Sequence, residues 1–432
     1  MLGVASAPTR PYGRVVSNFI VQALKGEPIT IYGAGSQTRS FCYVDDLIDG
    51  FVGFMKSPKH LTGRVNLGNP KEFTIKELAE LVIDMTESKS KAPLPVLIQP
   101  GPRNSLADVV GLFVGNAVDL NALTGVTVVL PDRPLLAAVD VRGGIPGTYH
   151  TDALGSGGLM RHISALVLTG GAAYGIDAVA GLTSWLGARG RGFAGWGAVI
   201  PLVCGAVIFD LTNGGNKLWG EVSPYRALAD AAAELAAADF ALGNAGAGLG
   251  AIAATLKGGL GTASAFDSVT GATVAALVVV NPYGSVTMPG SPTMWAWYLE
   301  QAGELGGQTF PTAVTGHAFE VKTGMASNTT IGVVATDAVL NHEDLQRLAM
   351  MSQDGYARAI RPVHTPFDGD TLFAISTEAV PVAQEPVTLL RLGTIAADVV
   401  ARAIMRGVFL AADIAGHQSY ATRWGAHLRG SG

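Results

Sequence analysis

The chain has 432 residues, of which 48% are hydrophobic and 15% are charged. This balance excludes an intrinsically disordered protein, and the net charge of −5 provides no global basic field for nucleic acid. Two distant cysteines, Cys42 and Cys204, form no disulfide framework or zinc-type spacing, so a soluble, cytoplasmic protein is the expectation.

The composition changes near residue 92. Residues 1–92 hold 11 Lys and Arg and 9 Asp and Glu, whereas the remainder is rich in Gly and Ala and sparsely charged. Between the two parts, Pro93, Pro95 and Pro100 indicate an extended linker or an entering strand. We therefore expect two domains, residues 1–92 and 93–432.

The first part has ordinary α/β patterning. Apolar spacing predicts a helix over residues 14–24, followed by a short strand over 28–32 and a turn over 33–36. Thr74 and Glu77 have the spacing of a capping box before an apolar stripe, which predicts a helix over residues 74–85.

The same residues carry a family resemblance. The segments are GRVVSNFIVQALKGEPITIYGAGSQTRSFCYVDDLIDGF and VNLGNPKEFTIKELAELV. They resemble the C-terminal third of UDP-glucuronate decarboxylase, an extended short-chain dehydrogenase. Neither the glycine-rich turn that cradles NAD nor the family's Tyr-x-x-x-Lys pair occurs in this chain, so the sugar-nucleotide contact matching Arg39 has no cofactor beside it. The expectation is a fragment without a catalytic centre; a nucleotide-sugar enzyme, which would carry bound NAD, is the alternative.

The second part alternates strand-like and helix-like runs, which predicts α and β layers around one large core. Expected strands are residues 135–141, 163–168, 206–209, 274–280, 330–336 and 372–376. Expected helices are residues 173–186, 223–237, 342–359 and 393–411, with Asn341 as an N-cap.

Residues 192–209 raise the question of a membrane segment because all 18 are uncharged. They include four glycines and a central Pro201, which are unfavourable in a spanning helix. We interpret them as two buried strands, or as a strand and a loop, and expect no membrane partner.

Four local features could carry chemistry, and each has a plainer structural reading. Glycine-rich residues 243–250 lack the Gly-Lys-Ser/Thr of a phosphate loop, so close packing is preferred. His162 and His364 have no nucleophile motif nearby. Asn-Thr-Thr at 328–330 alone suggests the start of a strand. Asp368 and Asp370 share a face if extended, or flank a hairpin turn at Gly369.

Taken together, six ordered motifs carry a second resemblance. They are GPRNSLADVVGLFVG, VDVRGGIPGTYHTDAL, ALVLTGGAAYGIDAVAGLTSWL, VIPLVCGAVIFDL, SNTTIGVVATDAVL and RAIRPVHTPFDGDTLFAIST. Over about residues 100–412 the set resembles the self-processing amidohydrolases that include D-aminopeptidase, β-peptidyl aminopeptidase and nylon-oligomer hydrolase. The resemblance implies a layered α-β-β-α sandwich of the D-aminopeptidase/ornithine acetyltransferase type, no cofactor, and a tetramer of processed protomers.

Family members cut their own chain once, immediately before the nucleophile. The matching bond here is Asn328–Thr329, which makes Thr329 the implied nucleophile and gives chains 1–328 and 329–432. A hydroxyl needs an adjacent base, and the α-amine freed by the cut titrates near neutral pH. Because that amine belongs to the same residue, little entropy is lost in positioning it.

Four further site residues follow from the same resemblance. Asn281 would donate its amide to the developing oxyanion. Lys257 would favour the neutral amine of Thr329, and Asp368 and Asp370 would orient that amine and balance Lys257. One departure is Phe209, which stands where nylon-oligomer hydrolase has tyrosine; it weakens the case for nylon oligomers more than for amide hydrolysis in general.

The expected substrate is therefore a short peptide or an amide oligomer, with no nucleic-acid partner. Two alternatives remain open. The first is acyl transfer to an amino acid, as in the similar ornithine acetyltransferase, which also cuts itself before a threonine. The second is an uncut, non-catalytic assembly protein in which residues 1–92 block maturation.

Overall fold

The structure is a computed structural model, and it comprises two compact units, residues 1–97 and 98–432. It describes residues 15–26, 29, 31, 38–41, 43–58, 72–89, 98–155, 157–309, 311, 320–322 and 328–428. The change in composition predicts a division near residue 92. In the structure the second unit begins with strand β3 (Ile98–Gln99), which pairs with β15 (Gly259–Asp267).

The first unit has its core between two helices, α1 (Val15–Lys25) and α3 (Ile75–Met85), which bury Phe19, Ala23, Leu78 and Val82 among others. The remaining elements are β1 (Thr38–Ser40), α2 (Val44–Met55) and β2 (Glu72–Thr74).

The predicted capping box is confirmed in the first unit. The Glu77 N–H donates to Thr74 Oγ1 at 3.1 Å, and the Thr74 N–H donates to Glu77 Oε2 at 2.7 Å. The expected turn over 33–36 and most of the strand over 28–32 lie outside the described residues, as does Cys42.

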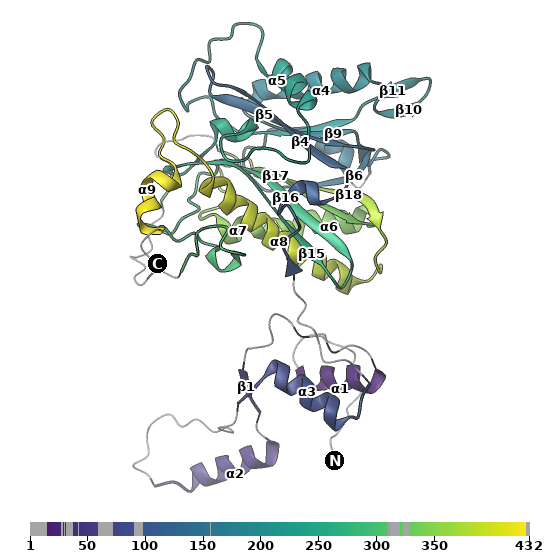
Figure 1. Ribbon diagram of the computed structural model, residues 1–432, viewed down its shortest axis with the longest axis vertical. Helices are drawn as coiled ribbons and strands as arrows, with labels where there is room; N and C mark the ends of the chain where they lie inside the picture. Colours follow the sequence, from purple (N-terminus) through teal and green to yellow (C-terminus); the bar gives the residue numbers. More distant parts are fainter. Residues whose placement is uncertain are drawn as a thin grey trace. The chain divides into compact units, whose positions relative to one another are not determined.

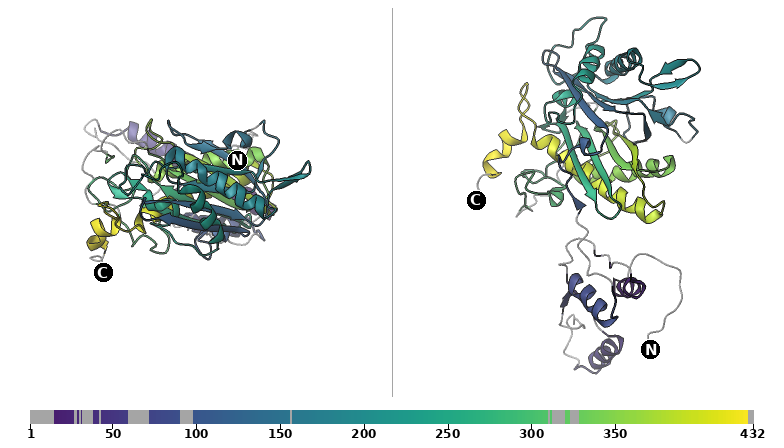
Figure 2. Two further views of the ribbon diagram at one scale, coloured as in Figure 1. Left: turned by 90° about the horizontal axis from the view of Figure 1, so that it is seen from above. Right: turned by 45° about the vertical axis from the view of Figure 1, so that its right-hand side comes forward.

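Four layers make up the second unit, in the order helices, sheet, sheet, helices (Figures 1 and 2). The five-stranded sheet has the order β4-β5-β9-β12-β7. Its strands are β4 (Leu112–Asp119), β5 (Thr124–Pro131), β9 (Ala165–Thr169), β12 (Val203–Val207) and β7 (Thr148–Tyr149). Helices α4 (Asp177–Ala188) and α5 (Tyr225–Glu234) cover its outer face.

The seven-stranded sheet has the order β3-β15-β16-β17-β18-β6-β8. Its remaining strands are β16 (Ala272–Val280), β17 (Ile331–Ala338), β18 (Thr371–Val380), β6 (Leu135–Val141) and β8 (His162–Ile163). Three helices cover its outer face: α6 (His342–Ser352), α7 (Asp354–Ala359) and α8 (Pro386–Phe409). A further helix, α9 (Tyr420–Leu428), follows α8 near the C-terminus.

The central strands are buried because both of their faces are covered. One face of β16 and β17 packs against the other sheet through Leu277, Val279 and Val333, and the opposite face packs against the helices. Strands buried on both faces read as continuous apolar runs, and β16 is such a run. The predicted α-β-β-α sandwich is confirmed.

Residues 192–209 form strands rather than a helix. β10 (Phe193–Gly195) and β11 (Ala198–Ile200) form an antiparallel hairpin, and β12 follows as a buried strand. Of the two alternatives, two buried strands is wrong, because the β10–β11 hairpin is largely exposed and only β12 is buried. Within the described part of the chain, no helix combines the length and the hydropathy needed to cross a bilayer.

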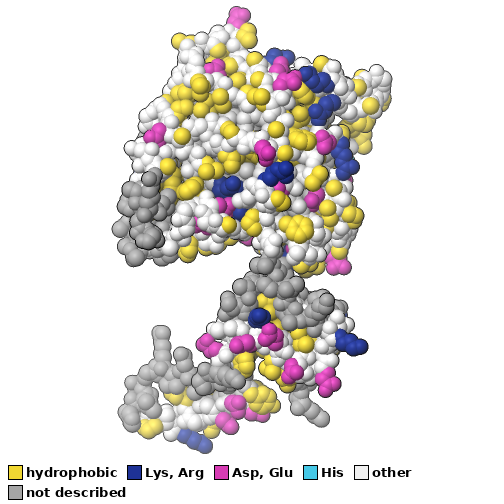
Figure 3. All heavy atoms as spheres, viewed as in Figure 1, with side chains coloured by type: hydrophobic (Ala, Val, Ile, Leu, Met, Phe, Trp, Pro, Cys, Tyr) yellow, Lys and Arg dark blue, Asp and Glu magenta, His cyan; other side chains and the backbone are white. Residues whose placement is uncertain are grey.

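Other predicted elements differ mainly at their ends. The helix expected over 342–359 is divided into α6 and α7, and Asn341 caps α6 by accepting the Asp344 N–H at 2.8 Å. Short strands β13 (Ile252–Ala253) and β14 (Leu256–Lys257) form a hairpin near the site described below. On the face seen in Figure 3, Lys and Arg side chains of the second unit are interspersed with acidic and uncharged ones.

Candidate active site

Thr329 lies two residues before β17, the middle strand of the seven-stranded sheet, and is 3% exposed. Its main chain is held by both neighbouring strands. On one side, the Thr329 N–H donates to the carbonyl oxygen of Asn281, the residue that follows β16, at 3.0 Å. On the other side, Asn328 forms a parallel bridge with Asp368, just before β18. The peptide bond between Asn328 and Thr329 is therefore fixed at the end of the sheet.

The carbonyl of Asn328 has two contacts that bear on its reactivity. The Gly369 N–H donates to this oxygen at 2.8 Å, and the hydroxyl of Thr329 also contacts it. An N–H aimed at a carbonyl oxygen stabilises the negative charge that develops when a nucleophile attacks the carbon. The arrangement therefore presents a hydroxyl to a polarised carbonyl.

Gly369 is required at its position by close approach. A Cβ built on it would lie 2.4 Å from the carbonyl oxygen of Ile145 and 2.7 Å from Thr329 Oγ1. From the sequence, Gly369 was expected only as the residue between two aspartates, in a strand or a hairpin turn. The Asp-Gly-Asp pattern draws attention to this glycine. The close approach itself is made by the loop that contains Ile145, which is far away in the sequence.

The two aspartates beside Gly369 accept hydrogen bonds from backbone N–H groups near Thr329. Asp370 Oδ1 accepts the Thr330 N–H at 2.8 Å. Asp368 Oδ1 accepts the Tyr283 N–H at 2.9 Å, and its Oδ2 accepts the Thr365 hydroxyl at 2.5 Å. Burial raises the pKa of Asp368, and the neighbouring Asp370 raises it further, while its hydrogen bonds oppose the shift.

Asn281 is fully buried, and its side chain contacts three separate segments, one of them through Lys322. Its Nδ2 donates to the carbonyl of Phe209 at 3.2 Å, and its Oδ1 accepts the Ile252 N–H at 2.9 Å. An amide has two N–H groups, so the contact with Phe209 leaves a second donor on the same nitrogen. Asn281 is thus brought against Thr329 by its main chain, while its side chain is held in a fixed orientation.

The ammonium of Lys257 is fully buried and donates to three carbonyls, those of Gly248, Ala251 and Gly258, at 2.8–2.9 Å. Gly248 belongs to the glycine-rich run considered above as a phosphate loop, and a Cβ there would lie 2.4 Å from backbone atoms. Within that run, Gly246–Gly250 form a buried 3₁₀ helix, packed closely enough to bring the Gly248 carbonyl to the lysine.

Lys322 is a second lysine at this site, and it was not among the residues predicted from the sequence. Its Nζ donates to Asn328 Oδ1 at 2.5 Å and to Asn281 Oδ1 at 3.2 Å. Burial lowers the pKa of Lys322 to about 7, and the opposite charges of Asp368 and Asp210 counteract that effect. No motif singled it out because a lone lysine in a loop has no recognisable pattern.

The two histidines considered as general bases lie in different surroundings. His364 Nδ1 lies 2.9 Å from Asp370 Oδ2, so this histidine contacts the site through a carboxylate. His162 Nε2 lies 3.1 Å from Glu378 Oε2 in a partly exposed hydrogen-bond contact. Only His364 is therefore associated with the residues around Thr329.

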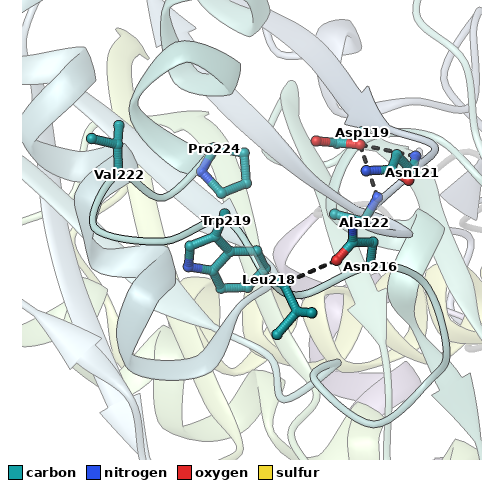
Figure 4. A pocket seen from close by; sticks show the side chains of 8 residues that line it. All are labelled: Asp119, Asn121, Ala122, Asn216, Leu218, Trp219, Val222 and Pro224. Carbon is teal, nitrogen blue, oxygen red and sulfur yellow. Dashed lines mark hydrogen bonds between the residues drawn. The ribbon is translucent and has the colours of Figure 1, made fainter.

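A pocket of about 120 Å³ lies elsewhere in the second unit, lined by Asp119, Asn121, Ala122, Asn216, Leu218, Trp219, Val222 and Pro224 (Figure 4). The one carboxylate of the pocket is Asp119, and it stabilises a turn. Its Oδ1 accepts the N–H groups of Asn121 and Ala122 at 2.9 Å each. The pocket includes none of the residues around Thr329 and has no acid–base pair, so it is not a candidate active site.

The lowered pKa of Lys257 predicts that the free energy of unfolding changes with pH. Burial lowers its pKa from 10.5 to about 7; Asp210 opposes this shift and Lys322 adds to it. Between these two values the unfolded chain holds a proton that the folded chain has lost. The free energy of unfolding should therefore rise with pH across this window, by up to about 1.4 kcal/mol per pH unit from this group.

Replacing Lys257 by methionine should remove this contribution. Urea denaturation of wild type and Lys257→Met at about pH 7.5 and 9.5 measures it, because the difference between the two proteins isolates the lysine from other titrating groups. The free energy of unfolding of wild type minus that of Lys257→Met should increase from about pH 7.5 to about pH 9.5. A difference that does not increase would contradict the lowered pKa.

Comparison with known proteins covers both units. Residues 104–422 match peptidase family S58. An uncharacterized aminopeptidase of Mycobacterium leprae is 41% identical over 348 residues, which is 75% of this chain and 95% of that protein. An uncharacterized aminopeptidase of Mycobacterium tuberculosis is 41% identical over 340 residues, covering 73% and 97% of the two chains.

Two solved structures share the fold. A β-aminopeptidase from Burkholderia sp. is 25% identical, with a TM-score of 0.57, and covers 78% of this chain and 96% of its own. The L-aminopeptidase D-Ala-esterase/amidase of Ochrobactrum anthropi is 22% identical, with a TM-score of 0.56, and covers 77% and 97%. Its structure is described as a variant of the Ntn hydrolase fold, which agrees with the sandwich seen here.

The first unit matches a different group. Residues 2–68 match the NAD dependent epimerase/dehydratase family. UDP-glucuronic acid decarboxylase 1 of Danio rerio is 48% identical over 97 residues, which is 22% of this chain and 23% of that enzyme. This chain therefore spans about a quarter of that decarboxylase. Because the S58 match extends over most of the chain and includes every residue placed around Thr329, this protein belongs to peptidase family S58.

Proposed function

We propose that this protein is a self-processing amide hydrolase that uses Thr329 as an N-terminal nucleophile and acts on short peptides or ω-amino-acid oligomers. The observation that carries the proposal is the pair of contacts at Asn328. Its carbonyl oxygen accepts the Gly369 N–H at 2.8 Å and is contacted by the hydroxyl of the next residue, Thr329.

In the processing step, Thr329 Oγ1 forms a bond with the carbonyl carbon of Asn328. The bond from that carbon to the Thr329 nitrogen breaks, the hydroxyl proton is transferred to the nitrogen, and an ester results. Water hydrolyses the ester and leaves a free amine on Thr329. The carbonyl of Asn281, which holds the Thr329 N–H in the uncut chain, can hold the amine in the same place afterwards.

In hydrolysis of a substrate, the freed amine serves as the base and Thr329 Oγ1 forms the acyl-enzyme. Asn281 supplies a second oxyanion donor through its remaining N–H. In their protonated forms Lys257 and Lys322 place positive charge near the amine and favour its neutral form, while Asp368 and Asp370 fix the backbone around it. Phe209, whose carbonyl holds Asn281, has no phenol, so we favour peptide-like amides over nylon oligomers.

The test is the intact mass of freshly purified protein under denaturing conditions. The expected result is two species, residues 1–328 and 329–432, in equal amounts. Processed protomers are then expected to assemble as tetramers and to hydrolyse amino-terminal amides. A single full-length species, in a preparation that nevertheless hydrolyses such amides, would contradict the mechanism.

A further inference from the structure

Lys322 joins the two residues that hold the Asn328–Thr329 bond. It donates to the side-chain oxygen of Asn328, the residue whose carbonyl is attacked, and to the side-chain oxygen of Asn281, the residue whose main-chain carbonyl holds the Thr329 N–H. One ammonium therefore bridges the acyl side and the amine side of the same peptide bond.

The surroundings of Lys322 favour a specific role over a general stabilising one. Its main-chain N–H donates to the carbonyl of Tyr283 at 3.2 Å, which anchors it beside the loop after β16. Asp368 and Asp210 act on its ammonium electrostatically as opposite charges, and Lys257 lies within electrostatic range. Lys257 directs its three N–H groups to carbonyls of the 248–258 segment, so the contact with Asn328 comes from Lys322.

We propose that Lys322 is a positioning residue for self-cleavage: it locks the Asn328 side chain against Asn281 so that the Asn328 carbonyl faces Thr329 Oγ1. This inference rests on the proposed function. The bonds that form and break are those of the acyl shift given above, and Lys322 neither gains nor loses an atom in it. A misplacement of about 1 Å between reacting groups can cost about a hundred-fold in rate, which is why the orientation of Asn328 matters.

The experiment compares maturation rates of the full chain. Protein is made in a short pulse of translation, and the fraction cut at Asn328–Thr329 is followed over time by intact mass. Lys322→Met, which keeps the length of the side chain but donates no hydrogen bond, should mature at least ten-fold more slowly than wild type. Lys322→Arg, which keeps the charge and the donors, should mature faster than Lys322→Met.

A matched control is Lys217→Met. Lys217 is also partly buried, and its ammonium donates to the carbonyl of Ala122, away from the Asn328–Thr329 bond. This variant should mature within two-fold of wild type. Thermal melts of all three variants show whether the fold is retained, so that a slow variant with a native melt supports a positioning role.

Three outcomes distinguish a failure of the role proposed for Lys322 from a failure of the proposed self-processing function. If wild type matures, Thr329→Val does not, and Lys322→Met matures at the wild-type rate, the role of Lys322 is overturned and the function stands. Equal slowing by Met and Arg would also overturn it, because donation would then not be the cause. If wild type never matures, the proposed function itself fails.

Discussion

Replacing Thr329 by valine is expected to leave the chain as a single full-length species and to lower amide hydrolysis by at least about a thousand-fold. Valine has the shape of threonine but lacks the hydroxyl, so the acyl shift cannot begin and no α-amine is freed. The nucleophile and its base are lost in one substitution. Intact mass reports the first effect, and hydrolysis of an amino-acid p-nitroanilide series reports the second.

Thr330→Val is the matched control, because it makes the same change one residue later. The hydroxyl of Thr330 is buried and has no hydrogen-bond partner among the described residues, and its contact with Asp370 is made by the main-chain N–H. This variant should therefore be cut and remain active. Cleavage of the Thr329→Val protein between residues 328 and 329 would assign the nucleophile elsewhere.

Gly369→Ala is expected to block self-cleavage and to lower hydrolysis in any protein that is cut. The added methyl group would lie 2.4 Å from the Ile145 carbonyl oxygen and 2.7 Å from Thr329 Oγ1, so either the loop or the hydroxyl must move. Movement of Gly369 also withdraws its N–H from the Asn328 carbonyl. Loss of one oxyanion donor costs about a hundred- to a thousand-fold in rate.

The measurement for Gly369→Ala is again the rate of appearance of the two chains, with a thermal melt to report the fold. Gly187→Ala in α4 serves as the control, since a Cβ there meets only the side chain of Pro201, at an ordinary 3.7 Å, and alanine favours a helix. A Gly369→Ala protein that matures as fast as Gly187→Ala would show that the close approach at residue 369 has no role in the cleavage.

The elements that were predicted well are those with a strong local pattern. The limits predicted for β6 are those observed, and β16 and β17 differ from prediction by one or two residues at their ends. Thr74 and Asn341 were identified as caps because capping needs only a side chain and an N–H two or three residues away. In each case the sequence contains both partners of the interaction.

Elements whose stability comes from distant partners were missed. All eight residues of β5 are buried, yet its glycine and threonines weaken the apolar run, and pairing with β4 and β9 holds it in place. The same applies to β15, a strand of small residues that packs directly against α8. Small residues carry little local preference but permit close packing, which only the partner element reveals.

The sequence by itself determined the family through its ordered motifs, and the sandwich and the candidate residues around Thr329 followed from that resemblance. Motifs and apolar periodicity suffice for this because they are local properties of the chain. Only the tertiary structure showed that the Gly369 N–H meets the Asn328 carbonyl and that Lys322 bridges Asn328 and Asn281. These contacts join the ends of β16, β17 and β18 to loops distant in sequence. They depend on strand register and on the reach of side chains, and neither property can be derived from the spacing of residues along the chain.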